Sequence, residues 1–293
     1  MPNLKEVRIR IASVQSTQQI TSAMKMVAAS KLRKGQNAIL QLRPYAKKLR
    51  EILQNLTASL EGSGESIYST HREIKKVLVV VMASNRGLCG AFNSNVIRTS
   101  VKHMQGNDPS LLETGRIGMI TIGKKATDFF RKNHYQVIES HDEIYNSMTF
   151  DAVAPIAESL MARYASGEYD RVDIIYNQFR SAAVQRLVVE QFLPVPPMES
   201  EAAQKFQSDY LFEPDKHRIV TELIPRSLKI QFFKDLLDSY ASEMGARMTA
   251  MHQATDNASE LLKDLKLSYN KARQAAITKE LLEIVTGAEA LKG

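Results

Sequence analysis

Residues 118–125 (GMITIGKK) carry the residue types of a phosphate-binding loop. Gly118, Gly123 and Lys124 stand at the spacing of a P-loop, in which backbone N–H groups and a lysine hold the phosphates of a nucleotide. Lys125 occupies the position where a Ser or Thr would hold the magnesium ion, and the residues between the glycines have the character of a strand. We therefore predict no nucleotide site in this segment.

Residues 84–93 (SNRGLCGAFN) lie between a predicted strand and a predicted helix, where dinucleotide-binding folds place a glycine-rich turn. The full G-x-G-x-x-G pattern is absent, so we interpret the segment as a tight turn in which Gly87 and Gly90 supply the backbone shape. Cys89 is the single cysteine, which rules out an internal disulfide. With no His or Asp beside it, Cys89 is expected to be a small packed residue rather than a nucleophile.

The titratable residues form no recognisable catalytic or metal-binding pattern. His141 and Asp142 resemble a metal phosphohydrolase dyad, but the other ligands are missing, and no Ser-His-Asp or paired-carboxylate arrangement stands out. We therefore predict that this chain has no catalytic, metal or cofactor site of its own. The histidines, none of which is spaced as a zinc ligand pair, are residues 71, 103, 134, 141, 217 and 252.

Both ends of the chain are predicted to form long helices whose apolar residues recur every three and four positions, the pattern of a coiled-coil seam. We expect helices at residues 3–60, kinked at Pro44, and at 219–286, about 100 Å long with an early bend at Pro225, closed on each other as an antiparallel coiled coil. The N-terminal seam contains Leu4, Val7, Ile11, Val14, polar Gln18 and Thr21, Met24 and Val27, and the C-terminal seam contains Leu237, Ala241, Met244, Met248, Met251, Thr255, Ala258, Leu262, Leu265, Tyr269, Ala272 and Ala276.

Between these helices the pattern changes to alternating strands and helices. Such alternation predicts a mostly parallel sheet with helices packed on it, a Rossmann-like α/β domain. The predicted domains are therefore a coiled-coil helix (1–60), an α/β domain (61–216) and a second coiled-coil helix (217–293). The predicted strands are 75–82, 116–122, 135–140, 171–179 and 185–193, the last two as an edge pair, and the predicted helices are 93–104, opening on Asn93 as a capping residue, 124–133 and 151–165.

The net charge of +7 is concentrated at the N-terminus, where residues 1–60 hold eleven Lys/Arg and two acidic residues. This excess fits a solvated helix face, a nucleic-acid surface or a surface for an acidic protein. Tyr45 is the one aromatic residue of the segment, which disfavours stacking on single-stranded nucleic acid. Five of the twelve methionines fall on the two terminal helices, where they either fill the seam or offer a deformable surface to partners: Met24, Met26, Met244, Met248 and Met251. No apolar run is long enough to span a bilayer, and no signal peptide is recognisable.

The sequence resembles the γ subunit family of F-type ATP synthases over essentially its whole length. The resemblance is carried by residues 20–34 (ITSAMKMVAASKLRK), 84–93, 209–215 (DYLFEPD) and 246–291. It implies a non-catalytic rotor shaft that couples ion flow through a membrane c-ring to ATP synthesis or hydrolysis. The implied partners are three α and three β subunits surrounding one copy of the shaft, with the ε subunit and the c-ring contacting the α/β domain as a foot.

The resemblance also implies contact residues. Residues 284–291 would lie in an apolar bearing at the top of the ring of α and β subunits. The expected contact residues are Met24, Lys25 and Met26 with the β levers, Arg273, Gln274, Thr278 and Glu280 with the β catch, and Tyr210 and Glu213 with the c-ring.

The resemblance further favours a bacterial origin and a peripheral location on the cytoplasmic face of the inner membrane. With Cys89 alone, the chain should lack the thiol switch of chloroplast relatives, and it begins directly with a predicted helix, without a transit segment. Two alternatives remain. One is a nucleotide-binding α/β enzyme, and the other is a nucleic-acid-binding coiled coil that uses residues 1–60.

Overall fold

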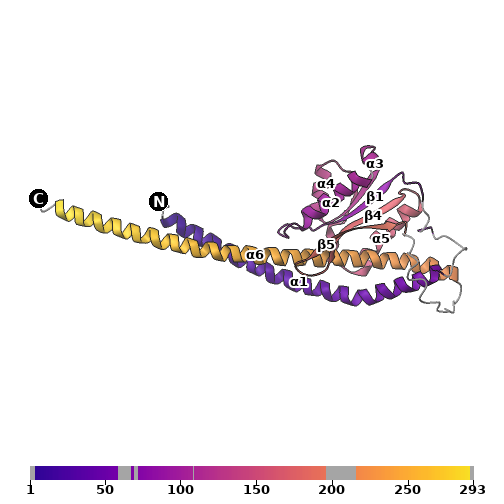
Figure 1. Ribbon diagram of the computed structural model, residues 1–293, viewed down its shortest axis with the longest axis horizontal. Helices are drawn as coiled ribbons and strands as arrows, with labels where there is room; N and C mark the ends of the chain where they lie inside the picture. The colour runs from indigo at the N-terminus through magenta and orange to yellow at the C-terminus, as the bar shows by residue number, and fades with distance from the viewer. Residues whose placement is uncertain (1–3, 59–66, 69–71, 108, 196–215, 291–293) are drawn as a thin grey trace. The chain divides into compact units, whose positions relative to one another are not determined.

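The computed structural model describes residues 4–58, 67–68, 72–107, 109–195 and 216–290. The chain divides into two compact units, one made of Met1–Ala28 with Met248–Gly293 and the other of Ala29–Arg247. These two units are defined by contacts between residues. The domain boundaries expected near residues 60 and 217 were placed where the sequence pattern changes, and they stay a prediction. Two long helices, α1 (Leu4–Ala58) and α6 (Lys216–Ala290), contribute residues to both units (Figure 1).

In the first unit, α1 and α6 form the predicted antiparallel coiled coil. Val7 and Ala28 of α1 and Met251, Ala258 and Leu262 of α6 are buried. Alternating steps of four and three, which keep the same side of a helix facing its partner, connect these positions within each helix. Both predicted helices are confirmed, with ends that differ by a few residues from those expected.

One predicted part of the seam is wrong. Val27 is 57% exposed, and the buried residue is Ala28. Alternating steps from Thr21 lead to Lys25 and then to Ala28, so the regular repeat continues through a charged residue. The sequence prediction followed hydrophobicity to Met24 and Val27, whereas the structure follows the spacing.

The second unit is built on a five-stranded sheet in the order β3-β2-β1-β4-β5, of which Figure 1 labels β1, β4 and β5. The first four strands are parallel neighbours and β5 pairs antiparallel with β4 at the edge, as predicted. The central strand is buried on both faces, which explains its uninterrupted apolar run. The strands are β1 (Val77–Met82), β2 (Ile117–Ile122), β3 (Val137–Ser140), β4 (Arg171–Phe179) and β5 (Gln185–Leu193).

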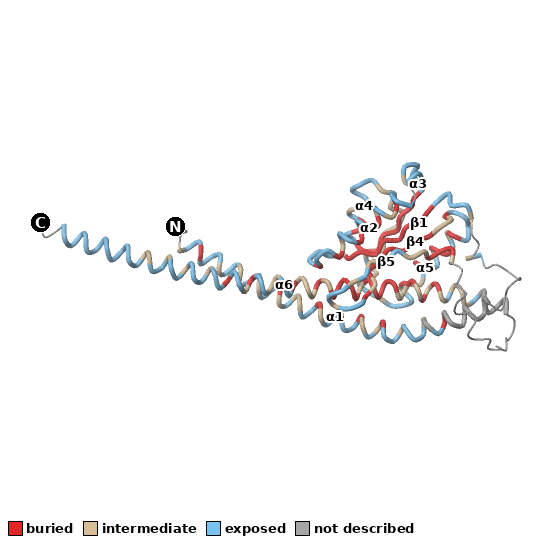
Figure 2. The backbone as a smooth tube through the Cα atoms, viewed as in Figure 1, coloured by how far each residue is buried: buried red, intermediate tan, exposed pale blue. Residues whose placement is uncertain are grey.

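Helices cover both faces of this sheet. Residues of α2 (Phe92–Asn107) and α4 (Lys124–Lys132) pack with Val77, Val79 and Val81 on one face. On the other face, α5 (Phe150–Ala165) and the part of α6 that belongs to this unit pack with Leu78 and Val80. Figure 2 shows the buried strands at the centre of these layers. Two short helices, α3 (Pro109–Glu113) and the 3-10 helix η1 (Asp142–Asn146), complete the unit.

Asn93 does not cap α2 in the expected way. The helix begins at Phe92, and the Asn93 side chain instead accepts a hydrogen bond from the backbone N–H of Ser84 (3.0 Å). The residue therefore stabilises the turn after β1 rather than the first turn of the helix. Pro44 and Pro225 both lie inside helices that continue across them, and the expected kinks stay a prediction.

Candidate interaction surfaces

The P-loop-like segment cannot hold a phosphate in the way its spacing suggests. Gly118 lies in the buried strand β2, and Gly123 connects that strand to α4 with a positive φ of 101°. The backbone N–H of Lys124 donates to Asn85 Oδ1 (2.9 Å) and that of Lys125 to the carbonyl of Ser84 (3.1 Å). Because the chain itself occupies these donors, the start of α4 offers no free cradle for an anion.

The turn at residues 84–91 is a closed polar cluster rather than a nucleotide-binding loop. Cys89 is buried, and the amide of Asn93 donates to its sulfur (3.3 Å). Burial raises the pKa of the Cys89 thiol, which disfavours a nucleophilic thiolate and fits the predicted packing role. Gly90 has the expected positive φ of 59°, but the second residue with positive φ in this turn is Leu88 (62°), not Gly87.

His141 and Asp142 do not converge on a metal site. The Asp142 carboxylate accepts a hydrogen bond from the Thr127 hydroxyl (2.9 Å), and His141 Nε2 lies 3.3 Å from the Glu139 carboxylate. In the part of the chain that the structure describes, no group of three or more His, Cys, Asp and Glu residues is arranged to hold a metal ion.

Polar pairs link the two helices of the coiled coil where an uninterrupted seam would be apolar. From one pair to the next, the α1 residue comes later in the sequence and the α6 residue comes earlier. Together the pairs therefore fix the antiparallel register. The sequence marked Gln18 and Thr21 as interruptions but gave no partners for them. The pairs are Arg8 with the Tyr269 hydroxyl (2.8 Å), Gln18 with Ser259 (2.7 Å), Thr21 with Thr255 (2.9 Å) and Lys25 with His252 (3.5 Å).

The three predicted lever residues differ in exposure. Met24 and Lys25 are half-buried, with Lys25 directed toward His252 across the seam, whereas Met26 is 65% exposed. Ile20 and Val27, which are seven residues apart and therefore share one side of the helix, are also exposed. These two residues extend the exposed apolar surface and were not selected from the sequence.

The four predicted catch residues, Arg273, Gln274, Thr278 and Glu280, are all exposed on α6. The Thr278 hydroxyl donates to the carbonyl of Gln274 (2.9 Å) within its own helix. From Ile277 to Ala290 every residue of α6 is exposed, including large apolar side chains such as Ile284, which is 67% exposed. A helix end with this many exposed apolar side chains is typical of a surface that another protein covers. The remaining predicted contacts, Tyr210 and Glu213, lie outside the described residues.

A buried charged cluster connects α6 to the sheet in the second unit. Lys234 Nζ lies 3.1 Å from Asp235, and both the Gln231 amide (2.8 Å) and the Tyr176 hydroxyl (3.0 Å) donate to Glu190 of β5. Burial, reinforced by the negative charge of Glu190, raises the pKa of Asp235 to about 7. The sequence did not predict this cluster, because its members are adjacent only after the sheet has formed.

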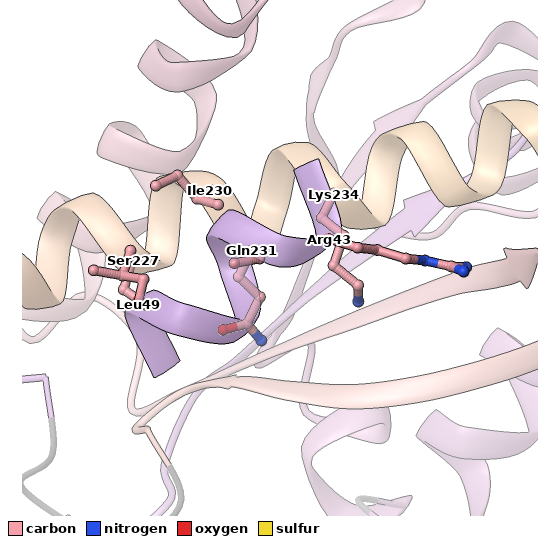
Figure 3. A pocket seen from close by; sticks show the side chains of 7 residues that line it. Arg43, Leu49, Ser227, Ile230, Gln231 and Lys234 are labelled. Atoms are coloured by element: carbon pink, nitrogen blue, oxygen red, sulfur yellow. The ribbon is translucent and has the colours of Figure 1, made fainter. Parts of the chain in front are cut away.

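A small cavity lies between α1 and α6 beside this cluster. Figure 3 shows Arg43 and Leu49 of α1 and Ser227, Ile230, Gln231 and Lys234 of α6 around it. Its volume of about 220 Å³ is below the usual range for small-molecule pockets. Lys234 is already paired with Asp235 and lies 3.8 Å from Asp238, so we interpret the cavity as part of the joint between the helices rather than as a ligand site.

Comparison with known proteins shows the family of the chain. Residues 3–291 match the family model described as ATP synthase. An ATP synthase gamma chain from Flavobacterium johnsoniae is 57% identical over 293 residues, covering 100% of both chains. The chain belongs to the ATP synthase gamma chain family.

Chains in solved ATP synthase structures share the fold. One chain in the Tetrahymena thermophila mitochondrial ATP synthase central stalk and c-ring is 25% identical with a TM-score of 0.61, covering 80% of this chain and 99% of that one. Another, from the Euglena gracilis mitochondrial ATP synthase OSCP/F1/c-ring structure, is 23% identical with a TM-score of 0.69, covering 98% and 94%. Among the described residues, no helix of this family member is sufficiently long and apolar to cross a bilayer.

Proposed function

We propose that this chain is the central rotor shaft of an F-type ATP synthase and has no catalytic activity of its own. The observation that carries the proposal is the 57% identity, over the full length of both chains, with an ATP synthase gamma chain. The proposed partners are three α and three β subunits around one shaft, the ε subunit and a membrane c-ring. The proposed location is peripheral, on the cytoplasmic face of a bacterial inner membrane.

A shaft can control catalysis without an active site because it is asymmetric. Three identical β subunits have identical nucleotide affinities unless something distinguishes them. A shaft that binds the β conformations with different free energies shifts their populations. Because linkage is reciprocal, rotation of the shaft changes nucleotide binding, and nucleotide exchange drives the shaft.

The proposed contacts lie on the coiled-coil unit and on the foot. Met24, Lys25 and Met26 would contact the β levers, and exposed Ile20 and Val27 on a neighbouring side of the helix would add apolar area. Tyr210 and Glu213 are proposed for the c-ring contact on the basis of the family resemblance. A second proposed set, assigned to the β catch, is Arg273, Gln274, Thr278 and Glu280.

The catch contacts can be tested with the pair Arg273→Ala and Gln274→Ala in the assembled complex. Both side chains are exposed, so the free chain should keep its circular dichroism spectrum and melting temperature. ATP turnover should fall about tenfold or more, because a contact made mainly in one rotational state changes a barrier rather than the fold. Arg116→Ala with Gln136→Ala, which likewise removes one exposed arginine and one exposed glutamine, is the matched control in the α/β domain and should keep the wild-type turnover. Unchanged turnover in the first pair would remove these residues from the proposal.

A further inference from the structure

A groove runs between α2 and α4 on the face of the sheet opposite α5. Its volume is about 760 Å³. The floor contains Ile97 and Val101 of α2 and Phe129 of α4, three half-buried side chains that extend the core beneath the helices. The Phe129 ring is held edge-on against Phe130, with 5.3 Å between the ring centroids. The floor is therefore a fixed apolar surface that is open to contact.

The rim of the groove is strongly basic. Arg98 and Lys102 of α2 and Lys125 and Lys132 of α4 line it, and all four are exposed. Asp128 is the one acidic residue of the lining. Within the described part of the chain, none of the four cations is in an ion pair with a carboxylate. The groove therefore presents unneutralised positive charge around an apolar floor.

The spacing of the lining residues fits a helical occupant. On α2 the lining recurs every three or four residues from Ser94 to Gln105, so the groove follows the helix for about 17 Å, or three turns. Grooves between two helices commonly accept the apolar face of a third, with anchors spaced at i, i+4 and i+7. A basic rim selects acidic residues beside those anchors.

We propose that the groove between α2 and α4 binds an acidic amphipathic helix of a partner protein. The apolar side chains of that helix would cover Ile97, Val101 and Phe129, and its carboxylates would lie against Lys102 and Lys132. Nucleic acid or an anionic membrane could neutralise the rim but would leave the aliphatic floor uncovered. This site goes beyond the proposed lever and catch contacts, because all of its residues belong to the second unit, whereas the lever and catch residues belong to the first.

The test uses the full chain and a designed peptide of about 14 residues, built of Leu, Ala and Glu with Leu on one helical face. A second peptide of the same composition has its Leu residues distributed around the helix. Fluorescence anisotropy should show at least about tenfold tighter binding of the patterned peptide. Equal binding of the two peptides would show attraction by charge alone and would overturn the proposal.

Matched charge reversals locate the site. Lys102→Glu with Lys132→Glu should weaken binding of the patterned peptide by about tenfold or more. Arg116→Glu with Arg186→Glu makes the same change in net charge away from the groove and should leave the affinity within about twofold. An equal loss in both variants would overturn the site. If the groove variant shows no cooperative thermal unfolding by circular dichroism, the milder pair Arg98→Gln with Lys125→Gln replaces it. This pair should also weaken binding of the patterned peptide by about tenfold or more.

Two further probes separate the proposed occupant from other anions. A duplex DNA and phosphatidylglycerol vesicles are each offered to the same proteins at physiological salt, where non-specific attraction is weak. The affinity for DNA or for vesicles should fall no more in the Lys102→Glu and Lys132→Glu variant than in the control variant. If one of them does while the patterned peptide does not, the groove is a nucleic-acid or membrane site and the proposal is wrong.

Discussion

The hydroxyl groups of Thr21 and Thr255 lie 2.9 Å apart across the antiparallel coiled coil. Each hydroxyl is also within hydrogen-bonding distance of a carbonyl of its own helix, 3.0 Å for Thr21 and 2.7 Å for Thr255. One hydroxyl can therefore donate across the seam while the other donates back along its helix. A polar pair at such a position fixes the register of a coiled coil at a cost in stability.

Substitution of this pair should show coupling. Thr21→Val or Thr255→Val alone should lower the free energy of unfolding by about 1 kcal/mol, because one partner loses its hydrogen bond across the seam. The free energy lost in the double variant should be smaller than the sum of the two single losses by at least about 1 kcal/mol, since both hydroxyls are replaced by methyl groups of similar shape. Urea unfolding followed by circular dichroism measures the cycle, with exposed Thr278→Val as the control. Purely additive effects would contradict a direct interaction.

Asp235 should make the second unit less stable as the pH rises toward neutrality. Its pKa is about 7 in the folded chain, above the unfolded value, so the folded state binds more protons between about pH 4 and pH 7. Stability should therefore fall with rising pH in this window, by up to about 1.4 kcal/mol per pH unit. Lys234 lies 3.1 Å away and Glu190 and Tyr176 face the same cluster, but burial outweighs the attraction of Lys234.

Asp235→Asn tests this dependence. The variant keeps the shape of the side chain and removes its titration, so its unfolding free energy should fall less steeply between pH 5 and pH 7.5 than that of the wild type. Asp128→Asn, on the exposed surface of α4, is the control and should keep the wild-type slope. If the unfolding free energy of Asp235→Asn depends on pH as steeply as that of the wild type, Asp235 is not the group that causes the pH dependence.

Gly123 and Gly106 should respond oppositely to alanine. At Gly123, φ is positive and a Cβ would lie 2.1 Å from the carbonyl oxygen of Ala83, so Gly123→Ala should cost about 3 kcal/mol or more. Gly106 lies in α2 with no atom near an added Cβ, so Gly106→Ala should stabilise the chain by about 0.5–1 kcal/mol. Thermal unfolding of the two variants checks both signs. A tolerated Gly123→Ala would contradict the tight turn between β2 and α4.

Arg247 should be important for holding the turn after β1. Its guanidinium lies 2.5 Å from the Glu243 carboxylate and donates to the carbonyl oxygens of Arg86 (3.0 Å) and Gly87 (3.3 Å). Arg247→Met leaves a buried carboxylate unpaired and should cost about 3–5 kcal/mol. Burial already raises the pKa of Glu243 despite Arg247, so the loss should be smaller at pH 5 than at pH 8.

The double variant separates the charge from the packing at this position. Glu243→Gln with Arg247→Met should be more stable than Arg247→Met alone, because no buried charge remains. Unfolding in urea at both pH values gives the comparison. If the double variant is no more stable than Arg247→Met, the unpaired Glu243 carboxylate is not what destabilises the single variant.

Much of this fold follows from local patterns. Strands β4 and β5 have the predicted bounds, and β1 lies within its prediction, because their apolar runs are bounded by polar residues and turns. The predictions failed where a residue has two plausible roles. Asn93 is a good capping residue, but Ser84 lies close enough to bind its side chain. The sequence prediction gave Gly87 and Gly90 the special backbone shape of the turn, whereas positive φ occurs at Leu88 and Gly90.

The interaction surfaces were less accessible to sequence reasoning. The exposed end of α6 follows from the seam, since the last predicted seam residue is Ala276 and the helix continues to Ala290. The groove between α2 and α4 could not be predicted, because Arg98 and Lys132 belong to separate helices brought together by the sheet. Asp235 gave no signal either, since an aspartate in an amphipathic helix is usually exposed and only the packed sheet buries it.

The central claim is tested most directly by co-expressing this chain with the α and β subunits of the same source and measuring the native mass and ATP hydrolysis of the product. The account predicts one copy with three α and three β subunits, and hydrolysis that disappears when residues 1–30 are removed. A chain that remains a free monomer or homodimer beside an assembled α/β ring would contradict the assignment as a rotor shaft.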